Sequence, residues 1–164
     1  YQTAEEEAHD LARCMQAIAQ STGHRPMGWL SPRCTPSART SELLATAGFD
    51  WHADFFDSDL PYRHSTPAGP ITAVPFTMEV NDMPLYVRYG SEPEAFTRTL
   101  ERILANWPLL GGPPACLDLT VHAHVFGRPF GVIELIKSLE AARRHAEWTW
   151  FTDHCWLAEL FKAG

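Results

Sequence analysis

The sequence predicts an α/β fold with a mainly parallel sheet, and two observations support this prediction. Short apolar segments of strand length alternate about four times with segments of helical periodicity. The composition, with 45% hydrophobic and 20% charged residues, is typical of a globular domain. We therefore expect residues 1–164 to form a single domain. A closed barrel of eight strand–helix units takes about 250 residues, so four units predict half a barrel or a small open sheet.

The first segment has a clear helix start and stop. Thr3 followed by Glu6 forms a capping-box pattern, and apolar residues then recur at helical spacing until Gly23. Residues 27–30 are short and apolar, and they predict a buried strand. The proline-containing segment 31–36 follows that strand, which is the usual place for a functional loop in an α/β fold.

The middle of the chain predicts a second helix, a second strand and a long connection to the next helix. Ser37 is expected to cap the helix, and residues 49–55 to form the strand. Residues 57–84 are rich in proline and glycine. Within them, the strand-like runs 71–74 and 76–80 predict a hairpin.

The last part of the chain predicts two further strands and three helices. The expected elements are a helix opened by Ser91 and Glu94, a strand at 117–125, a helix at 133–142, a strand at 148–151 and a helix capped by Thr152 or Asp153.

The charge and the cysteine pattern exclude several classes of protein. Thirteen basic and 20 acidic residues give a net charge of −7, which is the wrong sign for a nucleic-acid or anionic-membrane binder. No apolar stretch reaches the roughly 18 residues of a membrane span. The four cysteines form no C-x-x-C pair, which favours free thiols in the cytoplasm. Because the chain starts at Tyr1 rather than Met, an N-terminal signal stays open.

The strongest chemical signal is a pair of histidines near the end of a predicted strand. His122 and His124 would point to the same side of that strand, and Gly127, Arg128 and Pro129 form the turn that follows. Such a histidine acts as a general acid or base, because its pKa lies near neutrality. Two alternatives are a metal site that uses both rings and structural histidines bonded to the backbone.

Two further segments predict substrate contacts. Trp29, Pro32 and Arg33 lie after the first strand, where they would form a wall and offer a cation to a polar or anionic group. Asp59 and Tyr62 follow the second strand and suit a sugar hydroxyl or an amide. Rigid turns and loop-capping aspartates explain the same residues equally well. The sequence has no dinucleotide or P-loop motif, no G-x-S-x-G and no H-E-x-x-H.

The order and spacing of these segments are informative together. They are Arg25-Pro26-x-Gly28-Trp29-Leu30-Ser31-Pro32, Leu43-Leu44-x-x-x-Gly48-Phe49, Asp59-Leu60-Pro61-Tyr62, Val74-Pro75-Phe76-Thr77 with Asn81-Asp82, and His122-x-x-x-x-Gly127-Arg128-Pro129. This series resembles the second half of the polysaccharide deacetylase (NodB-homology) family, in its allantoinase-like and peptidoglycan deacetylase-like branch. The resemblance implies the C-terminal part of a distorted (β/α) barrel.

The resemblance also implies a chemistry. Family members use a divalent metal, usually zinc, to hydrolyse an N-acetyl or related amide: a metal-bound water attacks, an aspartate is the base, and a late histidine protonates the leaving amine. His122 matches that histidine. Trp29, Pro32 and Tyr62 match positions that line the groove. We expect these side chains to face one cleft that takes a small-molecule or glycan substrate.

One departure from the family pattern concerns the metal ligands. The family's metal ligands come from an early Asp-Asp and an H-x-x-x-H, and this sequence contains neither pattern. We therefore expect the metal-binding part to be a missing N-terminal segment or a companion chain, and an exposed sheet edge to favour homo-oligomers. Three functions stay open: carbohydrate N-deacetylation, allantoinase-like hydrolysis of a cyclic amide, and a non-catalytic binding or scaffold subunit.

Overall fold

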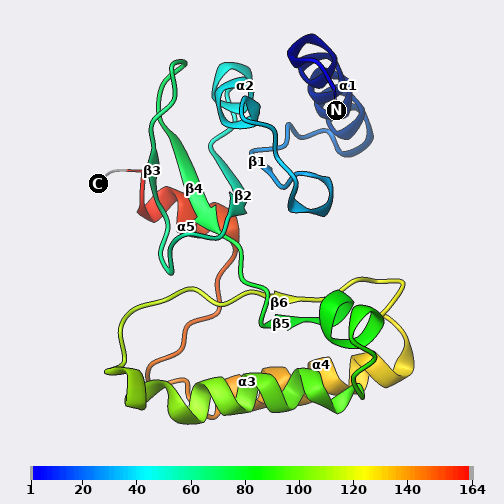
Figure 1. The fold of residues 1–164 in the computed structure, drawn as a ribbon, viewed down its shortest axis with the longest axis vertical. Helices are drawn as coiled ribbons and strands as arrows, with labels where there is room; N and C mark the ends of the chain where they lie inside the picture. Colours follow the sequence, from blue (N-terminus) through cyan, green and yellow to red (C-terminus); the bar gives the residue numbers. More distant parts are fainter. Residues whose placement is uncertain (1, 163–164) are drawn as a thin grey trace. The chain divides into compact units, whose positions relative to one another are not determined.

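The computed structural model describes residues 2–162, which divide into two compact units. The first unit comprises residues 2–76 and 152–162, and the second comprises residues 77–151. Both units combine helices with parallel strand pairs, so the predicted α/β class is confirmed (Figure 1). Within residues 2–162, no helix has the length and apolar character that crossing a bilayer requires.

The first unit contains a sheet and three α-helices. In chain order its elements are α1 (Ala4–Thr22), β1 (Gly28–Trp29), the 3-10 turn η1 (Pro32–Cys34), α2 (Thr40–Ala47), β2 (Trp51–Phe55), β3 (Tyr62–His64), β4 (Ile71–Pro75) and α5 (His154–Leu160). The strand order is β1-β2-β4-β3. β1, β2 and β4 are parallel, and β3 runs antiparallel to β4 at one edge.

The antiparallel pair differs from the predicted hairpin. The runs 71–74 and 76–80 were expected to pair with each other, but β4 pairs instead with the earlier β3. A hairpin needs a turn of at least two residues, and only Pro75 lies between the two runs. After Pro75 the chain makes one more bond to the sheet, from the Phe76 N–H to the Phe55 carbonyl, and then enters the second unit.

The sheet of the first unit is covered on both faces, as parallel sheets usually are. On one face α1 and α2 supply Leu11 and Leu44, which pack with Phe49 and Ile71. On the other face Ala158 of α5 packs against Ala53 and Val74. Figure 1 shows α5 lying across β2 and β4. The C-terminal helix is therefore part of the core of the first unit.

Two of the four predicted helix caps are formed, and the capping box expected from Ser91 and Glu94 is not, because α3 begins after Pro93, which makes no side-chain cap bond. Thr3 and Glu6 make a reciprocal capping box at the start of α1, and Asp153 accepts the Trp156 N–H at the start of α5. Ser37 does not cap α2, which begins only at Thr40. The Ser37 hydroxyl instead donates to Glu7 of α1 and accepts the Arg39 N–H, so it fastens the approach to α2 onto α1.

The second unit is mainly helical. Its elements are β5 (Val80–Asn81), the π-helical segment η2 (Met83–Arg88), α3 (Glu94–Asn106), the 3-10 turn η3 (Trp107–Leu110), β6 (Leu119–Thr120) and α4 (Pro129–Arg143). β5 and β6 form a short parallel pair. The core of the unit includes Val80 from β5, Phe96 and Leu100 from α3, and Val125 and Phe126 from the segment after β6.

Two predicted strands of the second unit are wholly or partly absent. Residues 117–125 were expected to be extended, but only Leu119–Thr120 pairs with another strand. Residues 148–151 form no strand, because the N–H groups of Trp148 and Thr149 bond to the His145 carbonyl and extend the turn after α4. Local hydrogen bonds replace the pairing between strands that the apolar pattern predicted.

Candidate functional site

The second unit brings His122 against Asp82. β5 and β6 pair in register, with Asn81 opposite Thr120, so the residues that follow both strands emerge at the same end. Asp82 follows β5 directly and His122 comes two residues after β6. The Asp82 Oδ1 atom lies 2.6 Å from Nδ1 of the His122 ring. Topology rather than sequence proximity therefore creates the pair, whose members are 40 residues apart.

The Asp82 carboxylate is fully buried and is held by three donors. Its Oδ2 atom accepts the backbone N–H of His122 at 2.7 Å and that of Phe126 at 3.2 Å. Because these contacts use Asp82 only as an acceptor, we assign the proton of the third contact to His122 Nδ1. The side chain of Asp82 is 0% exposed, whereas that of His122 is 37% exposed.

The other ring nitrogen of His122 remains available. Among residues 2–162, no hydrogen bond engages Nε2, and the ring is partly open to solvent. A buried carboxylate on Nδ1 fixes the ring orientation and stabilises the positive charge of the protonated ring. The arrangement can therefore give a proton to a bound group, or take one from it, through Nε2.

The turn that carries His122 differs from the predicted strand. Residues 122–127 form a turn in which the His122 carbonyl accepts the N–H groups of Val125 and Gly127. A Cβ atom at Gly127 would lie 2.1 Å from the Ala123 carbonyl oxygen, so only glycine fits. The expectation that His122 and His124 project from one strand is therefore wrong. The His124 ring is exposed and lies edge-on to His122, with ring centres 5.8 Å apart.

The chemistry of the side chains present does not fit a metal centre. Within the described part of the chain, no group of three or more His, Cys, Asp or Glu side chains is arranged to hold an ion. A catalytic zinc ion takes three protein ligands and leaves one open position. Residues 2–162 therefore do not present the three side-chain ligands that such a zinc site needs.

The first unit carries the other candidate residues from the sequence. The Trp29 indole N–H donates to the Ser31 hydroxyl at 3.1 Å, and its ring packs edge-on against Phe49. Pro32 opens η1 and Arg33 lies inside it with a φ of 58°, a left-handed conformation that is unusual for arginine. Pro32 and Arg33 are exposed, and a role in binding stays a prediction for these three residues.

Tyr62 and Asp59 are placed differently from each other. The Tyr62 hydroxyl donates to Asp57, at 2.9 Å to the nearer oxygen, and Asp59 is exposed in the preceding turn. Burial and then the hydrogen bond and charge of Asp57 raise the pKa of Tyr62 to about 12. Tyr62 also lies edge-on to Phe55, with ring centres 5.6 Å apart. The aromatic side chain is thus a neutral, fixed element next to a carboxylate.

One polar network in the first unit was not predicted. Ser31, His52 and Asp54 are buried, and Ser41 of α2 completes a chain of hydrogen bonds with them. His52 and Asp54 are two residues apart on β2, so their side chains emerge on the same face of the strand. That period-2 spacing of a histidine and an aspartate was the available signal, but their partners Ser31 and Ser41 come from other parts of the sequence.

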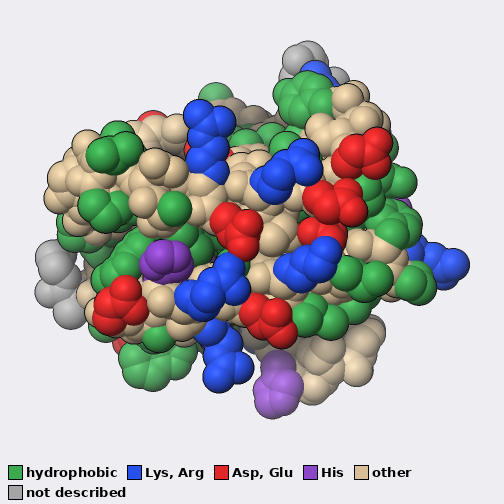
Figure 2. Space-filling model, turned by 90° about the horizontal axis from the view of Figure 1, so that it is seen from below, with side chains coloured by type: hydrophobic (Ala, Val, Ile, Leu, Met, Phe, Trp, Pro, Cys, Tyr) green, Lys and Arg blue, Asp and Glu red, His purple; other side chains and the backbone are tan. Residues whose placement is uncertain are grey.

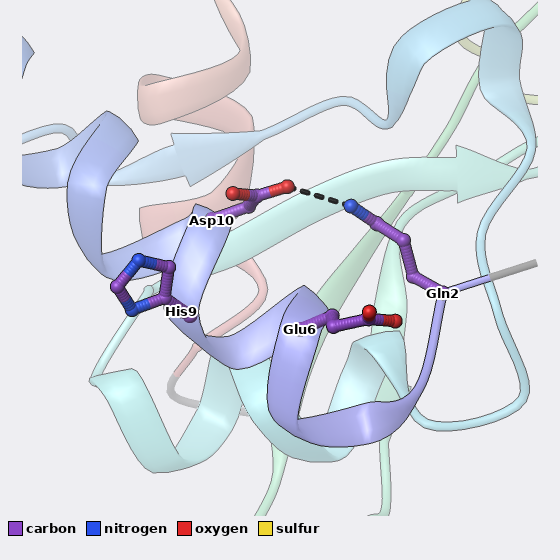
Figure 3. Close-up of a pocket in the computed structure, with 4 residues that line it drawn as sticks. All are labelled: Gln2, Glu6, His9 and Asp10. Atoms are coloured by element: carbon purple, nitrogen blue, oxygen red, sulfur yellow. Dashed lines mark hydrogen bonds between the residues drawn. The ribbon is translucent and has the colours of Figure 1, made fainter.

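The first unit has a surface hollow along its first helix. An open depression of about 570 Å³ runs along α1 and is lined by Gln2, Glu6, His9 and Asp10 (Figure 3). Gln2 donates to Asp10 across it, and Glu6 belongs to the capping box. We regard the hollow as a solvated helix face rather than a binding site.

Charged side chains of both signs are mixed on the surface. Figure 2 shows Lys and Arg side chains alternating with Asp and Glu side chains on one face. An exposed ion pair joins Arg144 and Glu101 at 2.8 Å.

Comparison with known structures identifies the fold. The crystal structure of Puue allantoinase matches 99% of this chain with a TM-score of 0.87 and 27% identity, and the match covers 55% of that chain. The structure of a probable polysaccharide deacetylase from Pseudomonas aeruginosa PAO1 matches 97%, with a TM-score of 0.84 and 25% identity, over 54% of its own chain. A putative polysaccharide deacetylase from Mycobacterium smegmatis matches 97% with a TM-score of 0.82, at 24% identity, over 57% of its chain.

Sequence comparison adds nothing to these structural matches, because no protein-family model and no curated protein matches the chain. The resemblance that the ordered motifs indicate is nevertheless confirmed by the three-dimensional comparison. The chain has the α/β fold of part of the polysaccharide deacetylase and allantoinase structures, and it spans about half of their length.

Proposed function

We propose that this chain belongs to a hydrolase of non-peptide amide bonds and that His122 is its general acid. The observation that carries the proposal is the pairing of His122 Nδ1 with the buried Asp82 at 2.6 Å, which leaves Nε2 available beside solvent. The matched structures are those of an allantoinase and of a probable polysaccharide deacetylase. The fold match and the dyad support the same reaction class.

Amide hydrolysis explains why a histidine is needed at this position. The amine is a poor leaving group until its nitrogen is protonated, and a protonated histidine can supply that proton during bond cleavage. In the proposed step the Nε2–H of His122 goes to the leaving nitrogen. Asp82 holds the Nδ1 proton and stabilises the charged ring beforehand, and it does not take the proton itself. Asp82 is thus a positioning residue.

The proposed substrate is an N-acetylated carbohydrate. Trp29 and Tyr62 are aromatic side chains of the kind that pack on sugar rings, while Asp59 and Arg33 are exposed groups able to bond hydroxyl or carbonyl groups. Pro32 makes the loop that carries Arg33 rigid. We propose that these five residues of the first unit contact the substrate.

A second candidate is hydrolysis of a cyclic amide. It is favoured by the match to Puue allantoinase, which has a TM-score of 0.87 and 27% identity. The same acid at His122 would serve a ring nitrogen as the leaving group. The two candidates differ in substrate and not in the role of His122.

Activation of the attacking water requires groups outside residues 2–162. No metal-ligand cluster exists within those residues, and the matched structures are nearly twice as long as this chain. We propose that a further polypeptide segment supplies those groups, either as part of the same natural protein or as a companion chain. This chain then contributes the acid and the substrate contacts.

The test compares two histidine variants in the natural protein that contains these 164 residues. Initial rates are measured with N-acetylglucosamine oligomers and with allantoin. Removing a general acid costs roughly 10²–10⁴ in rate, so His122→Ala should lower kcat by that amount. His124→Ala, which removes the neighbouring ring, should leave kcat within about threefold. A His122→Ala enzyme with normal kcat would refute the acid role, and inactivity of the natural protein on both substrates would favour a non-catalytic subunit.

A further inference from the structure

A second histidine–aspartate pair lies in the first unit and includes a serine hydroxyl. His52 Nδ1 lies 3.3 Å from Asp54 Oδ2, and His52 Nε2 lies 3.1 Å from Ser41 Oγ. Ser41 is in the first turn of α2, while the other two residues are on β2. His52 is 1% exposed and Asp54 is 7% exposed, whereas Ser41 is only partly buried.

The donor and the acceptor of each hydrogen bond that links Ser41, His52, Asp54 and Ser31 can be assigned. Asp54 accepts the Ser31 N–H at 2.9 Å and the Ser31 hydroxyl at 2.7 Å, while the Ser31 hydroxyl itself accepts the Trp29 indole N–H. A carboxylate bound in this way is an acceptor, so His52 Nδ1 carries the proton that it shares with Asp54. In the neutral ring, Nε2 then has a lone pair, and the Ser41 hydroxyl must donate to it.

We propose that Ser41 is an activated nucleophile that accepts an acyl group from activated esters or thioesters. The order serine, histidine Nε2, histidine Nδ1, aspartate is the order in which a nucleophilic hydroxyl is activated in unrelated hydrolases, and geometry rather than chain position defines it. The assignment is independent of the amide hydrolysis proposed for His122, because Ser41, His52 and Asp54 belong to the first unit.

The proposed reaction balances with these three residues. Ser41 Oγ forms a bond to the acyl carbon while its proton moves to His52 Nε2. The bond between the acyl carbon and the leaving group breaks, and the electron pair departs with the leaving group as a phenolate or thiolate. The positive His52 ring remains next to the negative Asp54. The proton stays on His52, and Ser41 is left as a neutral ester.

The burial of His52 restricts which acyl donors can react. Only 1% of the residue is exposed, so its Nε2 cannot reach a leaving group to protonate it. Donors whose leaving group is stable as an anion are therefore expected to react, and unactivated esters and amides are not. The same burial keeps water from being activated at Nε2, so the acyl-serine should persist instead of being hydrolysed quickly.

The first turn of α2 offers donors to the developing oxyanion. Among residues 2–162, no backbone carbonyl accepts the N–H of Ser41 or of Glu42. The first N–H groups of a helix lack partners within the helix, and they favour negative charge nearby. These groups accompany the nucleophile on the same turn, which is the arrangement that stabilises a tetrahedral intermediate.

The experiment measures acylation of the chain by p-nitrophenyl acetate and locates the acyl group by peptide mass spectrometry. We expect a release of about one equivalent of p-nitrophenolate per chain, followed by little turnover, with the acetyl group on Ser41. Ser41→Ala should abolish the release. Ser21→Ala is the matched control, because Ser21 is an exposed helix serine whose hydroxyl bonds to the Ala17 carbonyl, and it should react normally.

Two further measurements separate activation from simple exposure of the hydroxyl. His52→Gln keeps a side chain able to bond Ser41 but removes the base, so acylation should slow by roughly 10²-fold or more. Unfolding the chain in urea should remove the reactivity of Ser41 even in the unsubstituted protein. Acetyl groups found only on lysines or cysteines, or an unchanged rate in His52→Gln with a normal unfolding transition, would overturn the proposal. Sustained turnover at Ser41 would overturn its role as a stoichiometric acceptor.

Discussion

Asp82 binds His122 twice, once through the ring and once through the backbone. Its Oδ1 atom meets Nδ1 at 2.6 Å, and its Oδ2 atom accepts the His122 N–H at 2.7 Å. One buried carboxylate therefore fixes the position of the residue and the orientation of its side chain together. The third bond, to the Phe126 N–H, ties the same carboxylate to the turn beyond.

Replacing Asp82 should destabilise the second unit. Asp82→Ala removes the acceptor of two backbone N–H groups, one of them on the buried Phe126, and an unsatisfied buried donor costs about 1–3 kcal/mol. Asp82→Asn keeps one acceptor oxygen, so its free energy of unfolding should fall by less than that of Asp82→Ala. Urea unfolding measures both values, and hydrogen exchange at the Phe126 amide should accelerate most in Asp82→Ala. Unchanged exchange at that amide would contradict the assigned bond.

Tyr62 should ionise later than an ordinary tyrosine. Burial has the largest effect on its pKa, and the hydrogen bond with Asp57 and the charge of Asp57 add to it, so that the pKa rises to about 12. Because the raised pKa belongs to the folded state, the associated stability is complete below the ordinary tyrosine pKa of about 10 and is lost as pH rises toward 12. Ultraviolet titration should show a late-ionising tyrosine that Tyr62→Phe removes. If Asp57→Asn leaves its midpoint in place, the proposed contribution of Asp57 is wrong.

Glu134 should make the packing of α3 on α4 sensitive to acid. Burial alone would raise its pKa, but hydrogen bonds from Lys137 and Thr97 and the charge of Lys137 lower it below the usual value. The stability that these bonds provide is therefore present above the unfolded-state pKa and is lost as the pH falls below it. At neutral pH Glu134→Gln should cost about 1–3 kcal/mol, measured by denaturant unfolding.

The difference between the Glu134→Gln variant and the unsubstituted chain should shrink in acid. Glu101→Gln is the control, because Glu101 forms an exposed ion pair with Arg144 that should be worth less than about 1 kcal/mol. An equal loss for both substitutions at neutral pH would mean that the buried bond between Thr97 and Glu134, at 2.6 Å, contributes little.

Gly28 should tolerate no side chain. A Cβ atom there would lie 2.0 Å from the ring of Trp51, and that ring is stacked on His154 with centres 5.1 Å apart. Gly28→Ala should therefore lower the free energy of unfolding by about 1–3 kcal/mol, the usual cost of overpacking. Adding Trp51→Leu to Gly28→Ala should recover part of the lost stability. If the double variant instead loses more stability than the two single variants together, the contact with Trp51 is not the cause.

The helices were predictable because their signals are local. Thr3 and Glu6 cap the start of α1 through their side chains, and Gly23 ends it in a left-handed conformation. The spacing of Phe96, Leu100 and Leu104 marks the buried face of α3. The strands were less predictable, since a strand exists only where another strand pairs with it. Residues 148–151 have the apolar character of a strand but bond to the end of α4 instead.

The residues of the candidate site also differ in how well the sequence predicts them. His122 was identified because histidine followed by a Gly-Arg-Pro turn is a local pattern. Its partner Asp82 appeared in the sequence only as part of the Asn81-Asp82 motif, because the contact with His122 depends on the register between β5 and β6. His52 and Asp54 share one strand face, but no local pattern indicates that Ser31 and Ser41 complete their hydrogen bonds. Long-range pairing thus carries most of the chemistry.

The first unit is assembled from two segments that the second unit separates in the sequence, so it is completed only after the second unit has been synthesised. Residues 2–76 leave the ribosome early, but the sheet face formed by Ala53 and Val74 waits for Ala158 of α5. The whole second unit is translated in the interval. A nascent chain stopped before Thr152 would lack α5 and leave that face uncovered.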